Sequence, residues 1–320
     1  MNVGILYDAH NYTVTSIEND FSLLTEVTKI KQGLEEANHN VSLVENINEM
    51  VRIIVSSSEP PWDIIINHIS WTRTLQKVSP LTFLDFYNIP YVGNCHKALM
   101  LCADKYISKL IAQELNIPVP KYIFQSYPYK SLLNYSDIVA TLGSPFVIKA
   151  NGSSGSLGVK KICSCAEYER VCANFMKNWH SGILFEEFIS GIDLTVPVLN
   201  NGKEYHALAA IQYLDTDKKE IPFFTREIKY FEDICCQIFQ DKKITALLKK
   251  YATKIHTALY CNIFSRSDFR LTDNGQVFFL ECNATPDLNP SGAFVTAGDF
   301  TYPELLDHII RLSFEQATKT

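Results

Sequence analysis

The first 95 residues alternate between short apolar runs and stretches in which apolar side chains recur with helical spacing. Residues 3–7 and 41–44 form short apolar or β-branched runs, whereas residues 21–36 carry apolar side chains every three or four positions. Residues 62–67, which include three consecutive isoleucines, are typical of a buried parallel strand. The alternation of the two periods predicts an α/β layer fold for this part of the chain.

A predicted helix over residues 104–115 opens the middle of the chain, and two closely spaced prolines end it. Residues 145–149 and 159–162 are predicted strands, joined by a loop rich in glycine and serine. The backbone N–H groups of such a loop can fold over phosphate oxygens, and the cationic side chain of Lys149, at the end of the preceding strand, can offset the phosphate charge. An ordinary mobile hairpin with a solvated strand end is the alternative.

A hairpin near the C-terminus is the sharpest signal in the sequence. Residues 274–275 are Asn-Gly between two β-prone runs, which predicts a two-residue type I′ turn. Centred there, the hairpin places Arg266 opposite Asn283 and Asp268 opposite Glu281, all on one face. Opposed carboxylates repel unless a cation lies between them. Because two carboxylates and an amide oxygen suit Mg²⁺, the pattern predicts a magnesium site, with a solvated charged face as the alternative.

The opposite face of the same hairpin is predicted to be apolar and to pack into a core. The two-residue turn places Phe269 directly opposite Leu280. Strand alternation then puts Leu271 and Phe278 on the same face as this pair.

Composition and charge narrow the class of protein. The formal net charge of −6 over 320 residues disfavours a general nucleic-acid surface. No apolar run approaches the roughly 18–20 residues of a membrane span, and the N-terminus lacks the layout of a signal peptide. The nine cysteines have neither disulfide-framework nor zinc-site spacing, so we expect reduced thiols. We therefore expect a cytoplasmic protein with no nucleic-acid or membrane partner.

Taken in order, the motifs resemble those of the ATP-grasp superfamily, and in particular of the D-alanine–D-alanine ligase family. Residues 266–286 are similar to the family's R-x-D…L-E-x-N-x-x-P signature. Residues 104–105 resemble its D-K pair, residues 186–196 its E-x-φ-φ-x-G-x-E-x-T-V stretch (φ, apolar), and residues 229–230 its K-Y pair. The resemblance extends over about residues 62–315.

The resemblance implies an α/β (α+β) protein with a three-domain ATP-grasp architecture. It implies an N-terminal Rossmann-like domain at residues 1–96. A central ATP-grasp subdomain at residues 97–182 would carry the glycine- and serine-rich loop, and a C-terminal subdomain at residues 183–320 would carry the magnesium site.

The resemblance also implies a role for each matching residue. The expected nucleotide-binding set is Lys105, Lys149, Ser153, Ser154, Gly155, Ser156, Glu186, Glu187, Ile189, Asp193, Lys229 and Leu280. The expected Mg²⁺ ligands, for which Mn²⁺ can substitute, are Asp268, Glu281 and Asn283. Arg266 would face the reacting oxyanion, Tyr230 would lie over the acceptor, and Gly292 falls where the acceptor carboxylate binds.

The departures from the family pattern fall in the parts that select substrates. The family's S-x-E-x-x-V-S stretch is missing near the N-terminus, where Glu18 is only a weak substitute. Residues 69–74 replace its G-x-x-G-E-D-G run, Gly155 lies where a serine is usual, and Asp287 replaces the glycine after Pro286. The nucleotide and metal machinery is thus predicted to be retained while the amino-acid pockets are rebuilt.

We therefore expect an ATP-dependent carboxylate–amine ligase that forms an amide bond through an acyl phosphate and releases ADP and phosphate. Its expected substrates are small amino-acid, dipeptide or other carboxylate molecules rather than two D-alanines, and a homodimer is one option for assembly. A genuine D-alanine–D-alanine ligase of peptidoglycan synthesis is the first alternative. A non-catalytic nucleotide-binding ATP-grasp module is an alternative of another class.

Overall fold

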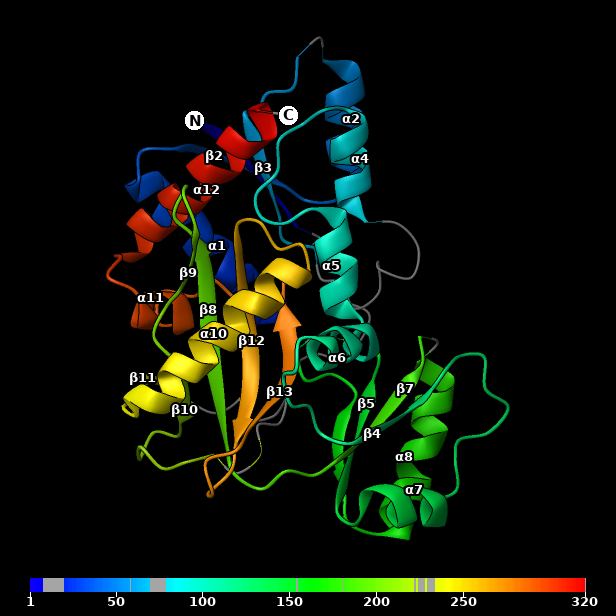
Figure 1. Ribbon diagram of the computed structural model, residues 1–320. Helices are drawn as coiled ribbons and strands as arrows, with labels where there is room; N and C mark the ends of the chain where they lie inside the picture. Colours follow the sequence, from blue (N-terminus) through cyan, green and yellow to red (C-terminus); the bar gives the residue numbers. More distant parts are fainter. Residues whose placement is uncertain are drawn as a thin grey trace.

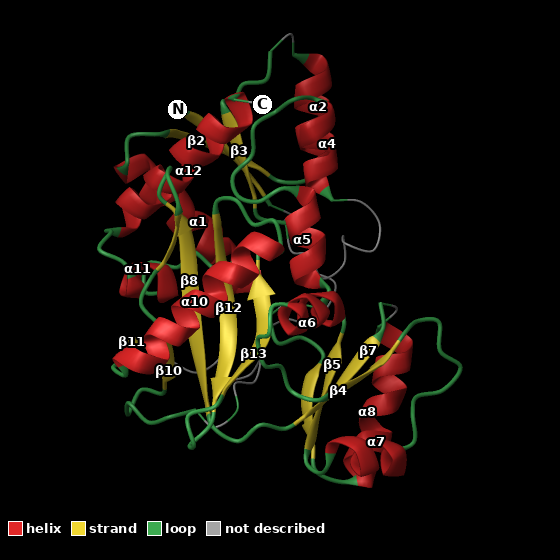
Figure 2. Ribbon diagram, in the orientation of Figure 1, coloured by secondary structure: helices red, strands yellow, loops and turns green. Residues whose placement is uncertain are grey.

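The structure is a computed structural model that describes residues 1–7, 20–57, 59–69, 79–153, 155–179, 181–221, 223, 228 and 234–319. Three β-sheets form its framework, and helices cover their faces (Figures 1 and 2). The architecture is mixed α/β, as the hydrophobic pattern predicts for the first 95 residues and the family resemblance implies for the whole chain. Within the described residues, no helix combines the length and the apolar character needed to cross a bilayer.

The N-terminal sheet is parallel, with strand order β2-β1-β3. Its strands and helices are β1 (Asn2–Leu6), α1 (Asp20–Glu36), β2 (Asn40–Val44), α2 (Ile47–Ser56), β3 (Ile64–Asn67) and α4 (Pro80–Phe86). The last helix of the chain, α12 (Tyr302–Thr318), returns to this unit, because Leu306 and Ile310 share a core with Val3 and Ile5. The two ends of the chain therefore lie on the same side of the molecule (Figure 1).

The central sheet is antiparallel, with strand order β4-β7-β5-β6, and helices α7 and α8 lie on its outer side (Figure 1). This part of the chain comprises α5 (His96–Ala103), α6 (Lys105–Glu114), β4 (Tyr122–Gln125), α7 (Tyr135–Leu142), β5 (Phe146–Ala150), β6 (Val159–Ile162), α8 (Cys165–Asn178) and β7 (Ile183–Glu187). Asp104 caps α6 by accepting a hydrogen bond from the Ile107 N–H at 2.9 Å, which fixes the start of the predicted helix.

The C-terminal sheet has strand order β11-β10-β8-β12-β13, and β9 pairs with β8. Its elements are β8 (Ile192–Asn200), β9 (Tyr205–Ala207), β10 (Ile211–Leu214), β11 (Cys235–Ile238), α10 (Lys242–Ala258), β12 (Phe264–Leu271), β13 (Val277–Asn283) and α11 (Ala293–Ala297). Helix α10 packs across one face of this sheet through Leu248, Ala252 and Ile255, which belong to the largest core.

The turn between β12 and β13 differs from the predicted type I′ turn. The loop has three residues, because the Thr272 N–H donates to the Gln276 carbonyl at 2.9 Å and the Gly275 N–H to the Thr272 carbonyl at 2.9 Å. Gly275 has a φ of 80°, whereas Asn274 is not among the residues with positive φ. A type I′ turn needs a positive φ at both central positions, so the prediction of its type was wrong.

The longer loop shifts the register of the hairpin by one residue. Phe269 pairs with Phe279 and not with Leu280, and a β-bulge follows between Asp268 and Phe269. The bulge leaves Leu280 as the extra residue on β13 and restores the predicted register, so that Asp268 faces Glu281.

The bulge also changes which side chains enter the core. Phe269 and Phe279 are fully buried and stack edge to face, with ring centroids 5.9 Å apart. Leu271 joins them in the core as predicted. Phe278 and Leu280, predicted to lie on that face, are outside the core, and Leu280 lines a cavity on the other side.

Candidate active site

A cavity of about 660 Å³ lies between the central sheet and the C-terminal sheet. It is lined by every predicted site residue that the structure describes: Lys105, Lys149, Ser153, Gly155, Ser156, Glu186, Glu187, Ile189, Asp193, Arg266, Asp268, Leu280, Glu281, Asn283 and Gly292. The predicted Ser154, Lys229 and Tyr230 lie outside the described residues, as does Glu18. The fold thus brings residues separated by almost 190 positions to one place.

Asp268 is the most heavily bonded carboxylate of this cavity. The Arg266 guanidinium grips it with two hydrogen bonds, from Nε at 3.0 Å and from Nη2 at 2.9 Å. The Asn283 side chain donates to it at 3.1 Å, and the Thr195 hydroxyl donates from the facing strand β8. Because Arg266 and Asp268 are two residues apart on β12, their side chains project from the same face of the strand, towards the cavity.

Glu281 lies across the strand pair from Asp268 and forms an ion pair with Lys105, whose Nζ is 3.3 Å from Oε2. Burial acts to raise the pKa of Glu281. The charges of Lys105, Lys149 and Arg266 outweigh burial and hold this pKa at about 2. The carboxylate therefore stays ionised at any ordinary pH, as a ligand for a hard cation must be.

A second charged group lies deeper, where Glu186 of β7 is held between two lysines. Its carboxylate is 3.0 Å from Lys109 Nζ and 2.7 Å from Lys149 Nζ, and Lys109 also donates to the Leu280 carbonyl at 2.9 Å. Burial would raise the pKa of Glu186, but the two lysines lower it. Burial lowers the pKa of Lys109 to about 8, against the opposing attraction of Glu186. These contacts tie the central sheet to β13.

Residues 111–311 match the family model described as D-ala D-ala ligase C-terminus, which covers more than half of the chain. The chain belongs to the D-alanine–D-alanine ligase family of ATP-grasp proteins. A relative from Desulfotalea psychrophila, "D-alanine--D-alanine ligase", is 27% identical over 315 residues, 95% of this chain and 93% of its own.

Two solved structures share the fold over nearly their whole length. The Bacillus anthracis D-alanine–D-alanine ligase complexed with ATP superposes with a TM-score of 0.75 at 20% identity, covering 100% of this chain and 99% of its own. VanG D-Ala:D-Ser ligase from Enterococcus faecalis gives a TM-score of 0.69 at 17% identity, covering 98% and 99%. At such identities the likeness concerns the fold, and the ATP-grasp architecture implied by the sequence motifs is confirmed.

Two functional candidates that the family motifs did not single out are Arg270, which lines the cavity, and Lys109, which is buried beside it and bonded to the cavity residues Glu186 and Leu280. Lys109 follows Lys105 by four residues on α6, so both reach the same side of the helix. Arg270 continues the alternation of Arg266 and Asp268 along β12 and lines the cavity. These spacings were the only signal in the sequence that Lys109 and Arg270 belong with the predicted site residues. Burial of Lys109 could not be expected from them, because a lysine is seldom buried without a partner.

Arg270 bridges two residues, Ile189 and Asp193, that the sequence motifs predict to bind the nucleotide. Its Nε donates to the Ile189 carbonyl at 3.0 Å, and its Nη1 donates to Asp193 at 2.8 Å. Burial raises the pKa of Asp193 despite the opposing charge of Arg270. The shorter carboxylate found here in place of the family's glutamate is therefore held by an arginine on the neighbouring strand β12.

The glycine- and serine-rich loop is anchored at its start. The Lys105 ammonium donates to the Ser153 carbonyl, and the Ser153 hydroxyl donates to the Ala150 carbonyl at 2.8 Å. Gly155 and Ser156 have φ values of 60° and 56°, so the backbone turns sharply where it lines the cavity. The cavity is therefore lined by several cationic side chains, among them Lys105, Lys149, Arg266 and Arg270, and by a turning backbone, while Leu280 contributes apolar surface. This combination suits a ligand with a ring and an anionic chain.

Proposed function

We propose that this ligase activates an amino-acid carboxylate by phosphoryl transfer from ATP and joins it to the amine of a second amino acid, with D-alanine as the first donor and acceptor to test. The observation that carries the proposal is the meeting of the opposed carboxylates Asp268 and Glu281 with Lys105 and Lys149 in one cavity. The name and near-complete overlap of the Desulfotalea psychrophila relative support D-alanine. They favour it over the other amino acids that the rebuilt motifs had suggested.

Asp268, Glu281 and Asn283 fit a magnesium ion, because they offer two carboxylates and an amide on adjacent strands. Mg²⁺ held there would neutralise the negative charge that shifts between the phosphate oxygens during phosphoryl transfer. The chain's own contribution is to position Asp268, which Arg266 and Thr195 fix from two directions. A carboxylate held in this way does not need to reorient when the ion binds.

Lys105 and Lys149 would bind phosphate oxygens, and Arg266 would stabilise the oxyanion formed when the amine attacks. Arg266 uses Nε and Nη2 for Asp268, and Nη1 is not part of these bonds. A guanidinium held by its carboxylate partner keeps its charge and its orientation. The walls of the cavity would keep water away from the activated carboxyl group, which water would otherwise hydrolyse.

A ligase for a different acceptor is a second candidate, and Asp287 favours it. This carboxylate follows Pro286, where the family has glycine, and it lines the same cavity. The Enterococcus faecalis protein named as a D-Ala:D-Ser ligase has the same fold, so the scaffold is compatible with an acceptor other than D-alanine. The identity of the acceptor is therefore the part of the proposal that most needs a direct test.

The test is phosphate release from the purified protein with ATP and Mg²⁺ across a matrix of paired D- and L-amino acids, with products identified by mass spectrometry. Release with D-alanine alone, together with a D-alanyl-D-alanine product, is the expected result. Release confined to wells with another acceptor would instead support the second candidate. ATP binding without ADP formation in every well would refute both and leave a non-catalytic nucleotide-binding module.

Two variants separate chemistry from folding in the same assay. Glu281→Gln should abolish most phosphate release at limiting Mg²⁺, whereas the matched surface variant Glu204→Gln should retain it, because Glu204 is exposed and outside the cavity. Arg266→Ala should lower turnover far more than it weakens nucleotide binding. The reverse pattern for Arg266 would contradict its assignment to the reacting oxyanion.

A further inference from the structure

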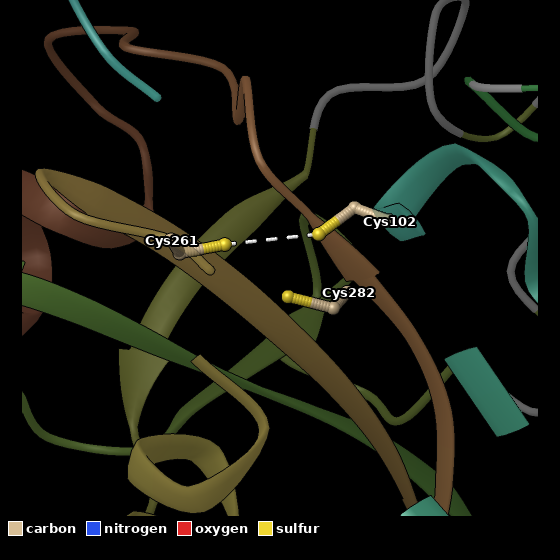
Figure 3. A group of neighbouring side chains, drawn as sticks. All are labelled: Cys102, Cys261 and Cys282. Atoms are coloured by element: carbon tan, nitrogen blue, oxygen red, sulfur yellow. Dashed lines mark hydrogen bonds between the residues drawn. The ribbon is translucent and has the colours of Figure 1, made fainter. Parts of the chain in front are cut away.

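Three buried cysteines meet behind the carboxylate-bearing face of β13. Cys102 lies on α5, Cys261 follows α10, and Cys282 lies on β13 (Figure 3). Their sulfur atoms all lie within 4.8 Å of one another, and Cys102 Sγ is 3.7 Å from Cys261 Sγ. The three residues are 5%, 1% and 2% exposed, and all nine cysteines are free thiols.

We propose that Cys102, Cys261 and Cys282 form a binding site for a soft, thiophilic metal ion, with Cu(I) or Zn(II) as the chemical class. Soft thiolate ligands select these ions over Mg²⁺, so the site would be chemically distinct from the carboxylate site. Each thiol that binds the ion releases one proton to solvent. The ion needs no oxidation or reduction of the sulfur atoms.

The spacing of the sulfur atoms is close to what such an ion requires. With a metal–sulfur distance of about 2.3 Å, sulfur atoms in tetrahedral or trigonal geometry lie roughly 3.8–4.0 Å apart. The Cys102–Cys261 distance of 3.7 Å already satisfies this, and no pair exceeds 4.8 Å. Binding therefore requires sulfur movements of less than about 1 Å, within the range of small side-chain adjustments.

Polar groups beside the thiols also lack their full set of hydrogen-bond partners. Ser267 faces Cys282 across the strand pair, so both side chains emerge on the same face. Its hydroxyl is fully buried beside the Cys282 thiol and meets no other hydrogen-bond partner among the described residues. His256, whose carbonyl accepts from the Cys261 N–H, is likewise fully buried. Its Nδ1 pairs with the Ser265 hydroxyl at 2.7 Å, whereas its Nε2 is unpaired within the part of the chain that the structure describes. Buried polar atoms normally have hydrogen-bond partners, so apolar packing alone does not account for the polar groups around these thiols.

The site shares its backbone with the catalytic cavity. Cys282 lies between Glu281 and Asn283, and Cys102 precedes Lys105 by three residues. An ion bound by the thiols would fasten β13 to α5 on the side opposite the cavity. It would thereby fix the distance between Glu281 and Lys105, now 3.3 Å, without entering the cavity.

The test is anaerobic titration of metal-free, fully reduced protein with Cu(I) or Zn(II), each in competition with a chromogenic chelator. We expect one ion per chain for at least one of the two metals. Cys102→Ala and Cys261→Ala should each bind it at least tenfold more weakly. Cys172→Ala is the matched control, because Cys172 is a partly buried thiol on α8 outside the cluster, and it should bind as the natural chain does.

X-ray absorption of the loaded natural protein gives a second readout that does not depend on any variant folding correctly. We expect a shell of three sulfur atoms around the ion. Weak non-stoichiometric binding, full binding by both cluster variants, loss of binding in Cys172→Ala, or a shell without three sulfurs would each overturn the proposal. Because none of these measurements uses ATP or turnover, their outcome is independent of the proposed ligase reaction.

Discussion

Lys109→Met is the change that most directly tests how the two ATP-grasp sheets are joined. Lys109 is fully buried, its ammonium lies 3.0 Å from Glu186 on β7, and it donates to the Leu280 carbonyl on β13 at 2.9 Å. Methionine preserves the length and the apolar stem of the side chain but removes the charge and the donor. The variant therefore reports on the electrostatic link and not on packing.

The expected loss of stability follows from what the substitution leaves behind. Removing one partner of a buried ion pair costs about 3–5 kcal/mol. Glu186 retains Lys149 at 2.7 Å, which places the ion-pair loss near the lower end of that range. The Leu280 carbonyl loses its donor, which adds about 1–3 kcal/mol if water does not reach it. We expect a total decrease in the free energy of unfolding of about 4–6 kcal/mol.

Equilibrium unfolding in urea, followed by far-UV circular dichroism, measures this decrease. Lys177→Met is the matched control, because Lys177 is exposed on α8, and it should change stability by less than about 0.5 kcal/mol. The double variant Lys109→Met/Glu186→Gln should be non-additive by at least about 1 kcal/mol, since the two groups interact directly. A loss below about 1 kcal/mol in Lys109→Met, or strict additivity, would refute the idea that this ion pair joins the sheets.

Three further predictions concern pH, backbone and metal. Because the pKa of Glu281 is lowered in the folded protein, its contribution to the free energy of unfolding should be complete above about pH 4.5 and lost as the pH falls towards 2. In unfolding measured without Mg²⁺, Glu281→Gln should therefore lose about 3 kcal/mol less than the natural chain over this pH range. Gly191→Ala should destabilise the protein by at least about 2 kcal/mol more than Gly143→Ala. A Cβ at Gly191 would lie 2.0 Å from the Leu271 carbonyl oxygen, whereas a Cβ at Gly143 would have no atom within 4 Å, and equal thermal shifts of the two variants would contradict this. Asp268→Asn should raise the Mg²⁺ concentration for half-maximal ADP formation more than about tenfold, and an unchanged requirement would exclude Asp268 as a ligand.

The parts of the fold that the sequence predicted depend on local pattern. The buried isoleucine run became parallel strand β3, and the aspartate before the helix at residue 105 became its N-cap, because burial period and capping are properties of neighbouring residues. The hairpin turn was mispredicted because Asn-Gly fits more than one loop. The β-bulge could not be predicted from the hairpin sequence. It becomes evident only in the folded sheet, where β12 pairs with β8 on one edge and with β13 on the other.

The candidate site divides in the same way. Motif residues such as Asp268 and Glu281 could be placed together from strand alternation alone, since they lie within one hairpin. Lys109, on helix α6, was missed because its partner Glu186 lies 77 residues away on strand β7, and only the fold shows that a buried ammonium can be neutralised there. The cysteine cluster was missed for the same reason, since its members come from three separate segments whose spacing follows no metal-binding motif.

The two irregularities of the β12–β13 hairpin have an evolutionary consequence. The extra loop residue and the unpaired Leu280 shift the register in opposite senses, so the carboxylates meet only while both are present. Deleting a residue from the loop alone, or removing the bulge alone, would turn one strand's ligands away from the other's. Insertions and deletions at the hairpin tip should therefore occur in this lineage as compensated pairs, and chain length here should vary less freely than in an ordinary surface loop.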